Sequence, residues 1–509
     1  MSNNTANDKR IARNTIYLTI RMFFVLGVSL YTSRVILAAL GIEDFGIYNV
    51  VGGFVTMFAF LNNAMTTGIQ RFYNVELGKN GIAGANKVYI TSLFSQLTLA
   101  VVILVIAESL GLWYMYNKMV VPDARFDAAV YIFHFFVFSL VINIMSVPYS
   151  AVIMAHEKMD YFAFVSIFDA VLKLGIALVV PHVSTDRLIA YGFLMLTITI
   201  VDLCLFVVYA KNKFEEIHFV KIFNGALFKS LLTFSGWNIF GKVAIMFKEQ
   251  GLNMVLNIFF GPVVNAARGI AFQVNGALAG FINNINIAVK PQLTQAYAQG
   301  DCQRTFSLMF SMSKLCYIIL LFMAVPVCME IDFILQIWLG DNVPEYTNIF
   351  IILVIATTFI NNLNAPVSFV VHAIGKMKKY QITTSAIELL ILPVAYIILK
   401  MGGAPWVVFV VALFFVVIGQ IISLKILKEL EDYSIKYYLI DVILPLLFVS
   451  AGSTLASFIV FQVLSSGFLS LCLVTVVSSI TILILSYLFV LNSSEKDTVK
   501  NIIREKLRN

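Results

Sequence analysis

Charged side chains inside long apolar runs are the residues of this sequence most able to do chemistry. Basic residues in such runs outnumber acids, and they are Arg21, Arg34, Arg71, Lys173, Lys242, Lys248, Arg268 and Lys314. The acids away from the ends of these runs are Asp169, Asp202, Glu249 and Glu388. Each charge at a bilayer centre costs about 2.5–3.5 kcal/mol on insertion scales, so the set favours a water-filled cationic cavity.

Some of these charges also have purely structural explanations. Arg71 and Lys314 lie near predicted cytoplasmic ends, where long basic side chains reach the interface. Asp169 and Lys173 are four residues apart, so they form an ion pair on one helix face. A structural role and a role in the cavity therefore stay open for each residue taken singly.

Polar residues at helical spacing accompany the charges. At about 100° per residue, four predicted helices carry polar stripes. The stripes comprise Asn14, Tyr17, Arg21 and Thr32; Asn63, Thr66, Thr67, Gln70 and Asn74; Ser235, Asn238, Lys242, Glu249 and Asn253; and Asn265, Arg268, Gly269, Gly276, Asn283 and Lys290. Hydrogen bonding between helices is one interpretation, and the wall of a polar lumen, with Asn63, Gln70, Asn238 and Asn283 facing it, is the other.

The elements that must position these residues are membrane-spanning helices. Hydrophobic residues make up 60% of the 509, charged residues only 12%, and the mean hydropathy is +0.90. A span needs roughly 20 apolar residues, so the pattern predicts an all-α polytopic membrane protein with fourteen spans. These are 14–39, 47–72, 88–112, 128–153, 161–181, 188–210, 229–258, 263–289, 306–329, 347–373, 380–399, 405–427, 438–462 and 467–491.

The placement of basic residues predicts the orientation. With alternating spans, most Lys and Arg residues outside the spans fall on the side of the N-terminus, and the opposite side holds Lys118, Arg125, Arg187 and Lys400. The positive-inside rule then places both termini in the cytoplasm. We expect the first span to be retained as a signal anchor, because its flanks do not resemble a cleavable signal peptide.

An internal repeat predicts how the spans are grouped. A shift of 218 residues aligns PYSAVIMAHEKM, which begins at Pro148, with PVSFVVHAIGKM, which begins at Pro366, at six identical positions. Near-equal shifts align Gly41 with Gly261. Because six is even, two six-helix lobes of the same orientation follow, in a 6+6+2 arrangement around a central cavity. The predicted parts are a first lobe at 1–215, a second at 216–432, and two further helices with a tail at 433–509.

Other classes of chemistry have little support in the sequence. The five cysteines, Cys204, Cys302, Cys316, Cys328 and Cys472, show no metal-binding spacing, and the five histidines are scattered singly. No nucleophile, base and oxyanion hole can be assembled from these motifs. We therefore expect no enzyme, no metal, no cofactor and no nucleic-acid partner.

The 6+6+2 pattern, the basic first span and the turn LGIEDFGIYNVV at Leu40 to Val51 resemble the Wzx-type polysaccharide flippases. These belong to the MATE-like multidrug/oligosaccharidyl-lipid/polysaccharide (MOP) exporter superfamily. The resemblance implies alternating-access transport of undecaprenyl-pyrophosphate-linked oligosaccharide across a bacterial inner membrane, for O-antigen (lipopolysaccharide), capsule or exopolysaccharide. It also implies a polysaccharide polymerase and a chain-length regulator as partners, besides membrane lipids.

The charges agree with that cargo, because Arg and Lys donors replace the hydration of a pyrophosphate. Our hypothesis assigns Arg21, Arg34, Lys173, Lys242, Lys248 and Arg268 to an anion path, with Arg71 and Lys290 at its cytoplasmic mouth. Asp169 and Glu249 are candidates for ion coupling. The alternatives are a cation-coupled multidrug exporter, a lipid II flippase of the same superfamily and a non-transporting scaffold for polysaccharide assembly.

Overall fold

The chain is entirely helical within the part that its structure, a computed structural model, describes. The backbone is described for residues 2–58, 60–156, 158–220, 224–431, 433–464, 466–492 and 495–496. Side chains are described for the same residues except 2–20, 60–61, 63–64, 67, 232–243, 284, 287–288 and 291. Within these ranges eleven helical stretches are long and apolar enough to cross a membrane, which indicates a multi-pass membrane protein.

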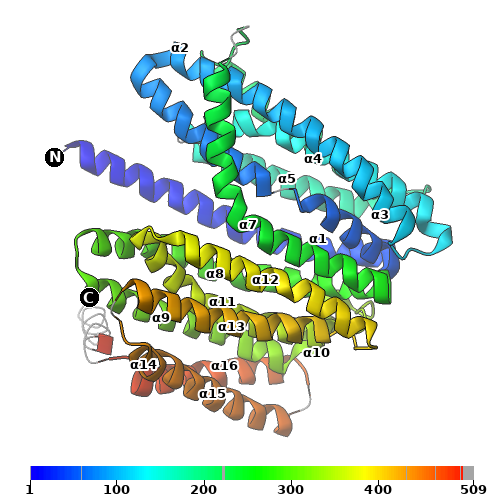
Figure 1. The fold of residues 1–509 in the computed structure, drawn as a ribbon. Helices are drawn as coiled ribbons and strands as arrows, with labels where there is room; N and C mark the ends of the chain where they lie inside the picture. The colour runs from blue at the N-terminus through cyan, green and yellow to red at the C-terminus, as the bar shows by residue number, and fades with distance from the viewer. Residues whose placement is uncertain are drawn as a thin grey trace. The chain divides into compact units, whose positions relative to one another are not determined.

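Two compact units divide the chain, Met1–Gly269 and Ile270–Asn509. Unit 1 holds seven α-helices and the beginning of an eighth (Figure 1). They are α1 (Ser2–Thr56), α2 (Phe60–Ile106), α3 (Leu112–Asn117), α4 (Phe126–Ala155), α5 (Met159–Val179), α6 (Arg187–Lys213), α7 (Gly225–Phe260) and α8 (Pro262–Ala298). Short turns η1 (Ala107–Gly111), η2 (Asp123–Arg125) and η3 (Val180–His182) connect them.

Unit 2 takes up the chain within α8 and continues with helices to the C-terminal region. They are α9 (Cys302–Met329), α10 (Ile331–Leu339), α11 (Thr347–Ile374), α12 (Met377–Lys400), α13 (Val407–Leu430), α14 (Ile435–Tyr438), α15 (Leu444–Val463) and α16 (Phe468–Leu485). The π-helical turns η4 (Leu439–Ile443) and η5 (Ser486–Val490) extend α14 and α16. The predicted lobes are defined by an internal repeat, whereas the two units are defined by compactness. The division into units therefore does not test the lobes, which stay a prediction.

All fourteen predicted spans coincide with helix. The first three spans lie in α1 to α3, which are continuous helices except for breaks at glycines and one turn near residue 58. The spans predicted at 229–258 and 263–289 correspond to α7 and α8, which are 36 and 37 residues long but too polar to belong to the eleven apolar stretches. The all-α class is confirmed, and fourteen spans are compatible with the observed helices.

The backbone repeats itself at the glycines where helices break. Gly41 breaks α1 with φ 82° and ψ 170°, and Gly261 separates α7 from α8 with φ 73° and ψ −172°. Gly81 breaks α2, which reverses direction along its length (Figure 1). Gly81 has φ 61°, and Gly300 between α8 and α9 has φ 77°. A side chain is strongly disfavoured at such angles. The two pairs are 220 and 219 residues apart, close to the 218-residue sequence repeat.

Each unit buries an apolar core. In unit 1, α2 and α4 pack together around residues such as Ile47, Phe54, Ile132 and Phe133, which are at most 8% exposed. In unit 2, α9, α11 and α13 enclose a second core, which includes Leu321, Val367 and Leu427. Most large apolar side chains of α15 and α16 that lie outside this core are exposed, as expected of helices that face lipid.

Candidate substrate path

A buried charge cluster joins α7 to α8 in unit 1. The Glu249 carboxylate lies 2.9 Å from Lys248 Nζ through Oε1 and 3.0 Å from Arg268 Nη2 through Oε2. Arg268 Nη2 also donates to the Glu249 carbonyl at 2.8 Å. The side chains of Lys248 and Arg268 are only 6% and 8% exposed, whereas that of Glu249 is 27% exposed. Two desolvated cations thus share the carboxylate of Glu249. The polar stripes predicted on these two helices do meet here.

Asparagines continue this polar contact along α7. Asn265 Nδ2 donates to the carbonyl and the side-chain oxygen of Asn253 at 2.7 and 2.8 Å, and Asn253 Nδ2 donates to Asn49 O at 3.2 Å. Asn257 exchanges two hydrogen bonds with the backbone of Val120, at 2.8 and 3.2 Å. Amide side chains therefore fix the register of α7 against α1, α8 and the loop after α3.

Glycines let the helices approach closely around the charge cluster. A Cβ on Gly46 would lie 1.9 Å from the carbonyl oxygen of Pro262, and one on Gly269 would lie 2.5 Å from the Asn49 side chain. A Cβ on Gly53 would lie 2.5 Å from Asn253 Nδ2. Small residues at these contacts bring the asparagine and charged groups within hydrogen-bonding distance.

A second charge cluster lies between α5 and α6. Lys173 Nζ donates to Asp169 Oδ2 at 2.8 Å, as the four-residue spacing predicts. Asp202 on α6 lies close enough to Asp169 for the two carboxyl groups to interact electrostatically. Two ionised carboxylates repel each other, which favours a proton on one of them. The pair is therefore a candidate proton site beside a lysine.

Two predicted anion-path residues lie on α1. Arg21 donates to Ser166 Oγ at 3.5 Å, and its guanidinium carbon lies 5.3 Å from the centre of the Phe162 ring on α5. Arg34 lines a cavity of about 490 Å³ together with Arg187. The structure does not bring Arg21 or Arg34 into the cluster around Glu249.

The remaining predicted residues are scattered over the two units. Arg71 and Asn283 are exposed, and Gln70 Nε2 donates to Met154 O at 3.4 Å. Lys290 is exposed, with Nζ 5.1 Å from the centre of the Phe369 ring. The side chains of Asn63, Asn238 and Lys242 lie outside the described ones.

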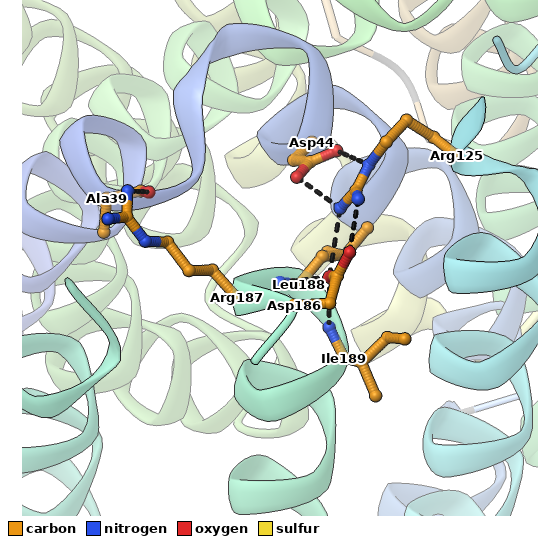
Figure 2. A network of polar contacts seen from close by, with 7 residues as sticks. All are labelled: Ala39, Asp44, Arg125, Asp186, Arg187, Leu188 and Ile189. Carbon is orange, nitrogen blue, oxygen red and sulfur yellow. Dashed lines mark hydrogen bonds and ion pairs between the residues drawn. The ribbon is translucent and has the colours of Figure 1, made fainter. Parts of the chain in front are cut away.

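Ionic contacts also tie together three segments at the end of unit 1 that the topology predicts to be periplasmic. Figure 2 shows Arg125 between two carboxylates, Asp44 of α1 and Asp186 before α6. Arg125 Nε lies 2.7 Å from Asp44, and Nη2 lies 3.1 Å from Asp186 Oδ1. Asp186 also accepts from the backbone N–H groups of Leu188 and Ile189, so it caps α6. The hydrogen bond from Arg125 holds the pKa of Asp186 below its usual range.

A buried cluster at the other end of unit 1 is equally absent from the sequence-based predictions. Tyr73 donates to Glu216, and His156 Nε2 lies 2.7 Å from the same carboxylate. Phe214 stacks on the His156 ring at 4.2 Å. Glu216 is 4% exposed, although it lies in a connection between helices. Helical periodicity cannot reveal such residues, because they lie outside the regular spans.

Comparison with solved structures identifies the fold. A lipid II flippase, MurJ, matches with a TM-score of 0.70 over 93% of this chain and 98% of its own, at 15% identity. A multidrug resistance MATE family transporter of the MOP superfamily matches with a TM-score of 0.66 over 83% and 99%, at 12% identity. The chain has the fold of a MOP-superfamily transporter. A further protein of this fold, a MOP superfamily transporter from Pyrococcus furiosus, matches with a TM-score of 0.54 over 83% and 96%, at 12% identity.

Sequence comparisons do not show which kind of transporter with this fold the chain resembles most. No protein-family profile matches the chain, and no curated protein sequence matches it. The MATE-like architecture that the sequence predicts is thus confirmed at the level of the fold, and identities of 12–15% do not distinguish the branches of the superfamily.

Proposed function

We propose that this protein is a flippase that moves undecaprenyl-pyrophosphate-linked oligosaccharide across the bacterial inner membrane by alternating access. The observation that carries the proposal is the cluster in which Lys248 and Arg268 share the single carboxylate of Glu249. Its two cations are buried among apolar helices, where they can form strong charge-assisted hydrogen bonds with an anionic ligand. A pyrophosphate is a ligand of the right sign.

The chemistry of the cluster suits a phosphorylated cargo. The guanidinium of Arg268 offers several N–H donors in a fixed plane, and one of its nitrogens is bonded to Glu249 in the structure. The carboxylate lowers the cost of burying the cations while the cargo is absent. Entry of a phosphate would replace part of this contact with stronger charge-assisted bonds. Arg21 and Arg34 on α1 would extend the path along unit 1.

The comparisons support transport of some kind and leave the cargo open. One protein of the same fold is described as a lipid II flippase and another as a multidrug resistance transporter. A lipid II flippase moves a lipid-linked cargo, and that match covers the larger share of this chain. The two buried cations of the α7–α8 cluster disfavour a lipophilic cation as cargo.

The carboxyl pair on α5 and α6 supports coupling to protons. Asp169 and Asp202 repel each other when both are ionised, so one of them would carry the coupling proton, and Lys173 pairs with Asp169 as the counter-charge. Loss of the proton would leave two adjacent carboxylates beside one ammonium group, a change large enough to shift the packing of α5 on α6. Glu249, the other candidate for ion coupling, forms ion pairs with two cations. Asp169 is therefore the stronger candidate for binding the coupling proton.

Location and partners complete the proposal. The bias of basic residues supports an inner-membrane protein with both termini in the cytoplasm. A flippase in that orientation would deliver its cargo to a polysaccharide polymerase and a chain-length regulator at the periplasmic face.

Deletion of the gene tests the proposal. We expect loss of a surface polysaccharide and accumulation of complete repeat units on their lipid carrier, and plasmid-borne wild type should restore the polymer. Lys248→Met and Arg268→Met should fail to restore it while reaching the membrane in normal amounts, because each leaves one cation for one carboxylate. Lys379→Gln, at an exposed ion pair with Glu429, is the matched control.

Two results would contradict the proposal. Full restoration by both Met variants would remove the charge cluster from the path. Unchanged polysaccharide together with altered efflux of cationic dyes would assign the protein to the multidrug exporters, and arrested cell-wall synthesis would assign it to the lipid II flippases.

A further inference from the structure

A cavity of unit 2 takes no part in the proposed anion path. It has a volume of about 390 Å³ and lies between the first turns of α9, the start of α14 with η4, and the segment that follows η5. The topology predicted from the sequence places this end of unit 2 on the cytoplasmic side. Sites for small molecules have volumes of about 300–1,000 Å³, so the cavity is large enough for a small ligand.

Four aromatic rings line the cavity, and they belong to Phe306, Phe310, Tyr433 and Tyr437. The Phe306 ring stacks on Tyr433 with the ring centres 5.4 Å apart, and the centre of the Phe310 ring lies 5.9 Å from that of Tyr437. These contacts hold the rings in place, yet Tyr437 remains 57% exposed. The face of an aromatic ring carries partial negative charge, so it attracts the polarised C–H groups of a sugar ring.

The same cavity contains neutral hydrogen-bonding groups. Gln303 and Ser307 are four residues apart, so they share one face of α9. Within the described part of the chain, neither side chain forms a hydrogen bond with the protein. Ser434 Oγ accepts from the Tyr437 N–H at 3.2 Å, so its hydroxyl hydrogen can still be donated. Amide and hydroxyl groups both donate and accept, as a ligand rich in hydroxyl groups requires.

The charges of the lining balance each other. Among the described lining residues, Lys314 is the one with an ammonium group and Asp441 the one with a carboxylate. Lys314 Nζ donates to Val490 O at 3.0 Å and lies 4.0 Å from the Glu495 carboxylate, so its charge already has partners in the protein. A lining of this kind favours a neutral ligand over a pyrophosphate or a lipophilic cation.

We propose that this cavity binds a neutral saccharide. Gln303, Ser307 and Asp441 form hydrogen bonds with its hydroxyl groups, and the bonds to the carboxylate are charge-assisted. The ring of Tyr437 stacks on one face of the sugar. The saccharide is either free in solution or the headgroup of a lipid, since both present the same hydroxyl groups. The site uses no residue of the α7–α8 charge cluster, so it can fail while the proposed function stands.

Saccharide binding by the purified full-length protein tests the site. The protein is kept in a detergent without a sugar headgroup, such as dodecyldimethylamine oxide, and binding is measured by isothermal titration calorimetry. The probes are maltose, lactose and N,N′-diacetylchitobiose, each as the free disaccharide and as its octyl glycoside. We expect saturable binding of at least one probe. Equal affinity for both forms would identify a free saccharide as the ligand, and a much higher affinity for the octyl glycoside would identify the headgroup of a lipid.

Variants and controls separate this site from other binding. Gln303→Ala with Ser307→Ala should weaken binding by about tenfold, since two hydrogen bonds are lost, and Tyr437→Ala should also weaken it. Arg304→Gln alters an exposed residue beside Gln303 that does not line the cavity, so it should bind like wild type. All variants should elute at the same volume in size-exclusion chromatography.

Three results would overturn the proposal. The first is that none of the probes binds, and the second is equal binding by the folded Gln303→Ala, Ser307→Ala double variant. The third is that octyldimethylamine oxide, which has the same chain and no sugar, displaces the octyl glycosides as well as the disaccharides do.

Discussion

Replacement of Glu249 by Gln tests how the two buried cations are held. The substitution keeps the shape of the side chain and removes its charge, so Lys248 and Arg268 stay buried and lose the carboxylate that they share. Loss of one partner from a buried ion pair costs about 3–5 kcal/mol. The amide oxygen still accepts one hydrogen bond and the Glu249 carbonyl still binds Arg268, so we expect the lower end, about 3 kcal/mol.

A second substitution makes the reasoning specific to charge. Adding Arg268→Met to Glu249→Gln removes one of the two buried cations, and it should recover part of the lost stability. Arg268→Met alone should be milder than Glu249→Gln alone, because Lys248 then pairs with Glu249. If side-chain volume decided the loss of stability, Arg268→Met would instead be the more destabilising of the two single variants.

Unfolding of the purified protein in detergent, followed by heat and by denaturant, measures these effects. Glu429→Gln is the matched control, because Glu429 and its partner Lys379 are 56% and 63% exposed. An exposed pair of this kind contributes about 0–1 kcal/mol. If Glu249→Gln changes stability no more than Glu429→Gln does, then the carboxylate does not hold the two cations and the electrostatic argument for the cluster fails.

Three further predictions follow from the contacts. Gly46→Ala should destabilise the protein by about 1–3 kcal/mol, because the new Cβ would lie 1.9 Å from the Pro262 carbonyl oxygen, whereas Gly27→Ala on the same helix meets nothing within 4 Å and should be neutral or stabilising in the same unfolding assay. Arg125 lowers the pKa of Asp186, so this ion pair contributes fully to stability above the ordinary carboxyl pKa of about 3.9. The contribution is lost as the pH falls through the lower pKa of the folded state. Arg125→Gln should therefore reduce the loss of stability at acid pH, and an unchanged loss would contradict the pairing. Asp202→Asn should keep a polar side chain beside Asp169 without an exchangeable charge, so transport in vesicles should lose its response to a pH gradient while the protein remains folded; a retained response would exclude the pair as the coupling site.

Long regular features of this fold are predictable from sequence, and short ones are not. Each predicted span lies in a helix because about 20 apolar residues admit no other structure in a bilayer. The nine-residue helix α10 lies in a segment treated as a loop, since it is too short to span. The break at Gly41 was expected as a turn from its alignment with Gly261, but its conformation only appears in the backbone angles.

The candidate sites were predictable in part, for a related reason. Periodicity places Glu249 and Arg268 on the polar faces of consecutive helices, so their contact follows from a short connection between the two. Asp44, Arg125 and Asp186 lie in three separate connections between predicted spans. The topology places these connections on one side of the membrane without saying which of them meet. Contacts of that kind depend on helix packing over more than a hundred residues of chain.

The paired glycines at 41 and 261 have nearly the same torsion angles, so the predicted repeat is closer in backbone conformation at this pair than in charge at the positions around it. At the same offset of 220 residues, Arg268 corresponds to Tyr48 and Glu249 to Ser29. The α7–α8 cluster therefore has no charged equivalent at these positions of the first copy. The two predicted copies therefore differ in charge at these positions. Specificity for a cargo can evolve in one half of the chain while the other half preserves the architecture.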